Sequence, residues 1–133
     1  MFAFFHKKDE SQPRRDWPWT LNIGGYTRSN PSWEDIRAGL EALVQDSESF
    51  LILEQKDPTG PKGRYWFIQC AVALEGPDAG QYSLEIGFRR DGKGHLLDRT
   101  LPRLEQAAAY FDRAFRGETV ELAGFEDMSD MVQ

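Results

Sequence analysis

The chain has 133 residues and a mass of 15.3 kDa, which fits one domain with a single hydrophobic core. Hydrophobic residues make up 40% of it and charged residues 29%, a balance that excludes both a disordered tail and a membrane-embedded protein. The 16 basic residues are outnumbered by 22 acidic ones, so the net charge is −6. A domain of this sign lacks the clustered cations that hold a nucleic-acid backbone, and we expect no nucleic-acid partner.

The sequence carries little that could serve catalysis. Cys70 is the one cysteine, and its apolar neighbours predict a buried, unreactive thiol. The two histidines, His6 and His95, lie far apart in the chain, and no glycine-flanked nucleophilic serine motif occurs. We therefore expect no catalytic residue, no metal site and no cofactor. No stretch approaches the ~20 apolar residues of a membrane helix, so we expect no membrane partner either.

A strand and a helix are predicted at the start of the folded region. Residues 17–28 alternate apolar and polar side chains, which predicts a strand that bends near Gly24 and Gly25. Asn30 and Pro31 then mark a helix start, with Asn30 as the N-cap and Pro31 at the first helical position. The helix is predicted to run for about four turns. Its apolar stripe consists of Trp33, Ile36, Leu40, Leu43 and Val44.

The middle of the chain predicts further strands. Residues 50–55 and 65–74 are apolar runs, and residues 82–90 alternate apolar and polar side chains. A hairpin turn signal at residues 91–92 leads to a short additional strand at residues 95–99. Because short loops join these strands, neighbouring strands must be antiparallel.

A second helix is predicted from about residue 100 to Arg116, and Gly117 is its C-terminal stop. The resulting order, β-α-β-β-β-(β)-α, indicates an α+β fold. We expect two layers, in which both helices cover one face of an antiparallel sheet of four to five strands.

Three regions are expected along the chain. Residues 1–16 are interpreted as a flexible leader, residues 17–117 as a single α+β domain, and residues 118–133 as an acidic C-terminal tail with five acidic residues and no basic one. The tail is either a solvated end or a device that steers a basic partner towards the protein. The apolar start of the leader is short and is followed, not preceded, by basic residues, so we expect a cytoplasmic protein instead of a secreted one.

The sheet face away from the helices is the most informative predicted surface. Alternation places Trp66 in the core and its neighbours on the open side. Aromatic groups beside a few charges are typical of a protein-binding surface. Two interpretations stay open: these side chains contact a partner, or the leader or tail folds over them. The predicted partner-binding residues are Glu54, Tyr65, Phe67, Gln69, Glu85 and Arg89.

Residues 30–36, NPSWEDI, followed by Leu40 and the apolar strand at residues 50–54, resemble the Imm1-like immunity proteins of bacterial polymorphic toxin systems and related small proteins of gut bacteria. The likeness covers about residues 19–117 and lies in the order and pattern of the elements. The resemblance implies an α+β domain that binds a cognate toxin in the cytoplasm and blocks the toxin's active site without catalysis of its own.

These observations predict a non-catalytic cytoplasmic protein-binding domain, with an immunity protein that neutralises a basic toxin domain as its specific form. Acidic groups would speed the encounter with such a toxin. The alternative is a homodimeric or small-ligand-binding domain. A small enzyme without a recognisable motif is the third interpretation.

Overall fold

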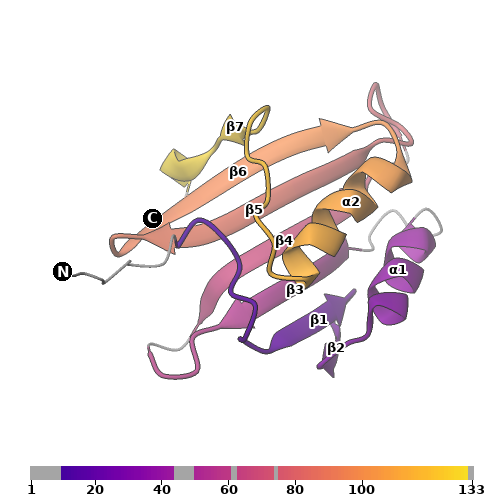
Figure 1. Ribbon diagram of the computed structural model, residues 1–133. Coiled ribbons are helices and arrows are strands. Elements are labelled where there is room, and N and C mark those ends of the chain that lie inside the picture. Colours follow the sequence, from indigo (N-terminus) through magenta and orange to yellow (C-terminus); the bar gives the residue numbers. More distant parts are fainter. Residues whose placement is uncertain (1–9, 44–49, 61–62, 74, 132–133) are drawn as a thin grey trace.

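The computed structural model describes all residues except 1–9, 44–49, 61–62, 74 and 132–133. Within the described residues, two helices lie on one face of a single antiparallel sheet, so the fold is α+β (Figure 1). The strands are β1 (Trp19–Ile23), β2 (Tyr26–Ser29), β3 (Phe50–Lys56), β4 (Arg64–Val72), β5 (Tyr82–Arg90), β6 (Lys93–Leu101) and β7 (Glu126–Asp127). The helices are α1 (Trp33–Ala42) and α2 (Leu104–Phe115), and the 3₁₀ turn η2 spans Ser129–Met131.

The sheet has seven strands in the order β2-β1-β3-β4-β5-β6-β7, which is more than the four to five predicted. The strand predicted at residues 17–28 is in fact a hairpin of β1 and β2. Gly24 and Gly25 form its turn with φ values of +55° and +92°, which two-residue hairpin loops require. At the other edge, the predicted acidic tail adds β7 beside β6, with Glu126 opposite Asp98.

Helix α1 begins later than predicted, because its N-cap is Ser32 and not Asn30. The Ser32 hydroxyl accepts a hydrogen bond from the Asp35 N–H (3.1 Å), and the Asp35 carboxylate accepts one from the Ser32 N–H (2.9 Å). Asn30 has a φ of +50°, whereas an N-cap needs extended backbone. The described helix is ten residues long, shorter than the four turns predicted, and Val44 lies outside the described residues.

Helix α2 ends where the sequence predicts. Gly117 has a φ of +70°, and the Glu118 N–H donates to the Arg113 carbonyl (2.9 Å), so the left-handed residue closes the last turn. The helix begins at Leu104, later than predicted. There, the Gln106 side chain accepts a hydrogen bond from the Arg103 N–H (3.1 Å) and satisfies one of the free donors of the first turn.

The hydrophobic core fills the space between the helices and the sheet. Directly opposed side chains on β4 and β5, such as Ile68 and Ile86, are fully buried, as the alternation predicts. Gly39 of α1 lies so close to the sheet that a Cβ there would come within 2.6 Å of Leu51 and 2.8 Å of Ile23. The buried residues of α2 that pack on the sheet are Ala107, Ala108, Phe111 and Ala114.

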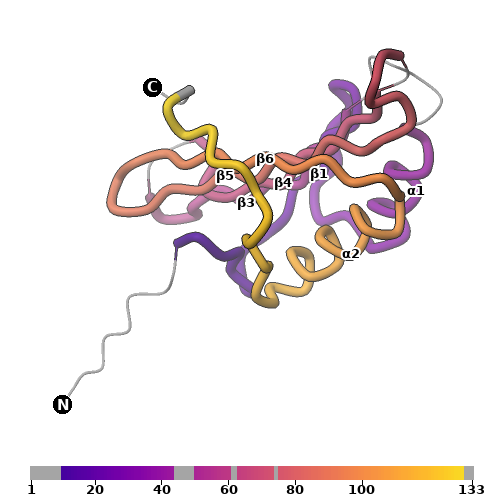
Figure 2. The backbone as a smooth tube through the Cα atoms, turned by 90° about the horizontal axis from the view of Figure 1, so that it is seen from above, coloured from indigo at the N-terminus to yellow at the C-terminus, as the bar shows by residue number. Residues whose placement is uncertain are grey.

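Residues 10–18, here called the N-terminal segment, lie on the helix side of the sheet next to the chain that follows α2 (Figure 2). Most of this segment was predicted to belong to a flexible leader, but Ser11 is only 2% exposed, and its carbonyl accepts a hydrogen bond from the Trp66 indole N–H (3.0 Å). The Gln12 side chain bonds both the N–H and the carbonyl of Val120 (2.7 and 3.2 Å). From Ser11 onward the chain is therefore packed against the domain.

The amide of Gln55 holds the N-terminal segment from within the core. This side chain is fully buried. Its oxygen accepts a hydrogen bond from the Arg14 N–H (2.9 Å), and its nitrogen donates to the carbonyls of Arg14 and Trp17. A buried polar side chain is tolerated when its hydrogen bonds are made, and here the backbone of another segment makes them.

Replacing Ser32 with alanine removes the hydroxyl that caps α1, so we expect Ser32→Ala to lower the free energy of unfolding by about 1 kcal/mol. Chemical denaturation measures this change. Ser29→Ala, at an exposed strand position, is the control and should stay within about 0.5 kcal/mol. Equal effects of the two substitutions would show that the cap contributes nothing.

Replacing Gln55 with leucine keeps the volume but leaves buried backbone groups of Arg14 and Trp17 without partners. We expect Gln55→Leu to lower the free energy of unfolding by about 2 kcal/mol or more. Gln69→Leu, on the partly exposed side of the sheet, should change it by less than about 0.5 kcal/mol. A silent Gln55→Leu in the same denaturation experiment would mean that the segment docks without this amide.

Candidate functional site

The open face is the side of β3–β6 that faces away from α1 and α2 (Figure 2). The structure brings most of the predicted partner-binding residues together on this side. Tyr65 is the exception, because it lies at a register irregularity of β4 and is buried against the N-terminal segment. Glu54 lies opposite Phe67, and Gln69 lies opposite Glu85. A hollow of about 420 Å³ opens among them. The predicted residues that line the hollow are Tyr65, Phe67, Gln69, Glu85 and Arg89.

The two aromatic residues of this group differ in how they are covered. Tyr65 is only 7% exposed, because the edge of the Trp17 ring packs against it (centroids 4.6 Å apart) and Arg14 donates to its hydroxyl (3.4 Å). Burial raises the pKa of Tyr65. Trp17 and Arg14 of the N-terminal segment therefore cover Tyr65.

Phe67, in contrast, is half-buried and belongs to the surface of the open face. Its ring lies across Gly87 of the next strand, where any Cβ would come within 2.0 Å of the ring. The guanidinium of Arg64 lies 4.7 Å from the ring centroid, and the same group pairs with Glu54 (2.8 Å). Gly87 and Arg64 together fix the ring flat against the sheet.

Three carboxylates cross the open face in a line, which we call the acidic row: Glu85 of β5, Asp98 of β6 and Glu126 of β7. Each lies directly opposite the next in the strand register, so their side chains point to the same side. Burial, together with the neighbouring Asp98, raises the pKa of Glu85. Like charges placed directly opposite each other destabilise a sheet, so the fold tolerates the row at a cost in stability.

Arg89 stands at the other end of the hollow. Its guanidinium lies 5.6 Å from the centre of the Tyr65 ring. Its buried Nε–H has no hydrogen-bond partner among the described residues. Buried donors are rarely left without an acceptor, so this group is a position at which an incoming acceptor would be stabilising.

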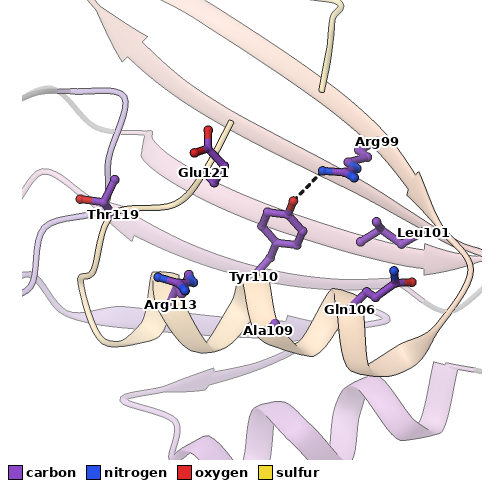
Figure 3. A pocket seen from close by; sticks show the side chains of 8 residues that line it. All are labelled: Arg99, Leu101, Gln106, Ala109, Tyr110, Arg113, Thr119 and Glu121. Atoms are coloured by element: carbon purple, nitrogen blue, oxygen red, sulfur yellow. Dashed lines mark hydrogen bonds between the residues drawn. The ribbon is translucent and has the colours of Figure 1, made fainter. Parts of the chain in front are cut away.

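A second concave site lies on the helix side, between β6, α2 and residues 117–125 (Figure 3). We call it the arginine pocket, and its volume is about 560 Å³. Sequence reasoning did not find it, because the segment that closes it was interpreted as a tail. Its lining consists of Arg99, Leu101, Gln106, Ala109, Tyr110, Arg113, Thr119 and Glu121.

Arg99 is the best-anchored residue of the arginine pocket. Its Nη1 donates to the Tyr110 hydroxyl (2.7 Å) and to the Ala123 carbonyl (3.3 Å), and the first of these bonds is drawn in Figure 3. The guanidinium also lies 5.9 Å from the ring centres of Tyr110 and Phe125, which pack edge to face 5.4 Å apart. These contacts hold the guanidinium in one orientation.

Cys70 and His95, which the sequence also singled out, pack against neighbouring residues of the fold, and His6 lies outside the described residues. Cys70 is fully buried, as predicted, and burial raises the pKa of its thiol to about 12. His95 stacks on Phe88, with ring centres 5.2 Å apart. Within the described residues, no three His, Cys, Asp or Glu side chains come together in a way that could hold a metal ion. Nor does any helix there have the length and apolar character to cross a membrane.

Comparisons with protein-family models, with curated proteins and with solved structures gave no match to this chain. The resemblance to Imm1-like immunity proteins therefore stays a prediction. The open face and the arginine pocket are the two features of the fold whose geometry bears on function.

The acidic row should make the free energy of unfolding depend on pH. Because the pKa of Glu85 is raised in the folded protein, its stabilising contribution is fully present below its ordinary pKa of 4.5 and is lost as the pH rises through the raised value. Glu85→Gln should therefore raise the free energy of unfolding at neutral pH by up to about 1 kcal/mol, and the gain should vanish in acid.

Denaturation of the Glu85→Gln variant across a pH series measures this effect. Glu118→Gln, which changes an exposed carboxylate outside the row, is the control and should show no pH-dependent gain. If Glu85→Gln destabilises the protein at neutral pH, the carboxylate is satisfied by its surroundings and the argument from like charges is wrong.

Proposed function

We propose that this chain is a non-catalytic protein-binding domain whose open face binds a basic region of a partner protein. The observation that carries the proposal is the acidic row, three aligned carboxylates on the sheet face opposite α1 and α2. Cationic groups of a partner would reduce the repulsion among the three carboxylates. The charges that destabilise the free domain therefore favour binding of a basic surface.

The hollow beside the acidic row supplies the rest of an interface. Phe67 offers a fixed aromatic surface, which is the kind of side chain that anchors protein–protein contacts. The guanidinium of Arg89, which lines the hollow, can donate a hydrogen bond to a carbonyl or carboxylate of the partner. In such an interface, the charged row orients the partner and speeds its association, and the aromatic side chain contributes most of the affinity.

The resemblance to immunity proteins specifies this proposal further. A toxin domain with a basic substrate-binding surface would meet the acidic row, and the open face would block that surface in the cytoplasm. The acidic excess of the whole chain, −6, favours rapid encounter with such a domain.

Site-specific photo-crosslinking in the source cells tests the proposal directly. A photoreactive phenylalanine analogue at position 67 should give an adduct with a separate, basic protein. The same analogue at Glu41, on the exposed surface of α1, should not give that adduct. An adduct with a second copy of the chain would instead identify a homodimer, and one with the chain's own terminal residues would show that this face is covered internally. Either outcome contradicts the proposal, as does the absence of any adduct.

Charge reversal then measures the contribution of the acidic row to binding of the cross-linked protein. We expect Asp98→Lys to weaken the affinity at least tenfold and to slow association, because it places a cation where the partner's cations must sit. Asp78→Lys makes the same change in net charge on an exposed loop between β4 and β5 and should alter affinity less than threefold. Equal weakening by both variants would show that net charge alone, not the row, attracts the partner.

A further inference from the structure

We propose that the arginine pocket binds a small organic oxyanion, a carboxylate or phosphate group carried on a flat apolar body. This inference is independent of the proposed function, because the pocket lies on the helix side of the sheet and the acidic row lies on the other. It rests on the charge, the rigidity and the shape of the pocket.

The charge of the pocket is unusual for this protein. Arg28, Arg37, Arg64 and Arg116 each pair with a carboxylate. The hydrogen bonds that Arg99 makes, in contrast, go to neutral oxygens of Tyr110 and Ala123.

The guanidinium of Arg113 likewise makes no ion pair in the part of the chain that the structure describes. Although the chain has 22 acidic residues, no carboxylate among the described residues is bonded to either of the two guanidinium groups that face this cavity. Such a site attracts an external anion.

The donors of the pocket are fixed before any ligand arrives. Gly124, with a φ of +88°, lets the chain pass so close to Arg99 that a Cβ there would come within 2.9 Å of Nη1. The Tyr110 hydroxyl accepts from Arg99, so its own proton is free to be donated to a ligand. The oxygen of the Gln106 amide is bonded to the Arg103 N–H, which leaves the amide N–H groups as donors. Preorganised donors lower the entropic cost of binding.

The shape of the pocket fits an organic body and not only a free ion. Gln106, Ala109, Tyr110 and Arg113 lie three and four residues apart on α2 and share one face of the helix (Figure 3). The Tyr110 ring, Ala109 and Leu101 of β6 form an apolar wall between the polar groups. A volume of about 560 Å³ lies within the ~300–1,000 Å³ typical of small-molecule sites.

Glu121 also lines the pocket and opposes an anion. Its carboxylate accepts a hydrogen bond from the Ala123 N–H (3.0 Å), which ties it to the segment that closes the pocket. The ligand's anionic group therefore belongs beside Arg99 and Arg113, with its apolar body on the Tyr110 wall. Removing the Glu121 charge should strengthen anion binding, because one repulsive partner is lost.

Calorimetric titration of the full chain tests the proposal with four probes. Phenyl phosphate carries a ring and a phosphate, and phenylacetate carries a ring and a carboxylate. Inorganic phosphate lacks the ring, and benzyl alcohol lacks the charge. We expect saturable binding of phenyl phosphate or phenylacetate at least tenfold tighter than that of inorganic phosphate, and no binding of benzyl alcohol. The tighter of the two ring probes identifies the oxyanion.

Three variants connect that binding to the pocket. Arg113→Gln changes an exposed side chain and should weaken the preferred probe about tenfold. Glu121→Gln should strengthen its binding about threefold. Arg116→Gln removes the same charge one turn further along, outside the pocket lining, and should leave binding within twofold.

Three results would overturn the proposal. Equal weakening by Arg113→Gln and Arg116→Gln would mean diffuse electrostatic attraction without a site. Inorganic phosphate binding as tightly as phenyl phosphate would show that the apolar wall contributes nothing to binding. The absence of saturable binding by both ring probes would refute the site altogether, and the open-face experiments would be unaffected.

Discussion

The buried amide of Gln55 is the interaction on which the rest of the architecture depends. It sits in the core, opposite Trp66 in the sheet register, and it replaces the hydrogen bonds that water would give to the backbone of residues 14–17. Because those bonds are made, an irregular segment can close the end of the core beside Trp66 and above the end of α2. The same segment packs Trp17 against Tyr65 and bonds the backbone of Val120 through Gln12.

The two faces of the sheet differ in the charges that they present. On the helix side, apolar burial and a closing C-terminal segment create a rigid cavity with two guanidinium groups. On the open side, the register aligns carboxylates that the fold itself would be more stable without. Because the aligned carboxylates lower the stability of the isolated domain, binding of a cationic molecule there would recover free energy. This property distinguishes the open face from an ordinary solvated surface.

Local patterns predicted most of the regular elements and, for residues 82–90, the side of the sheet on which the apolar residues lie. The alternation in residues 82–90 coincides with β5, and Gly117 ends α2, because each signal is decided by neighbouring residues. The acidic row and the arginine pocket could not be foreseen. Both depend on residues 118–127 docking along β6, and a segment with four acidic residues carries no local signal for that pairing. The Ser32 cap was similarly hidden, since Asn30 fits the same role in sequence but adopts a left-handed backbone.

The bond between Gln12 and Val120 joins positions 108 residues apart, and this separation bears on how the protein is made. The ribosome releases the chain from its N-terminus, so the segment around Gln12 emerges long before its partner. Until Val120 is synthesised, this bond cannot form, whereas the bond between Trp66 and Ser11 needs no residue beyond position 66. Docking of the Gln12 side chain onto residue 120 is thereby delayed until that later segment has been translated.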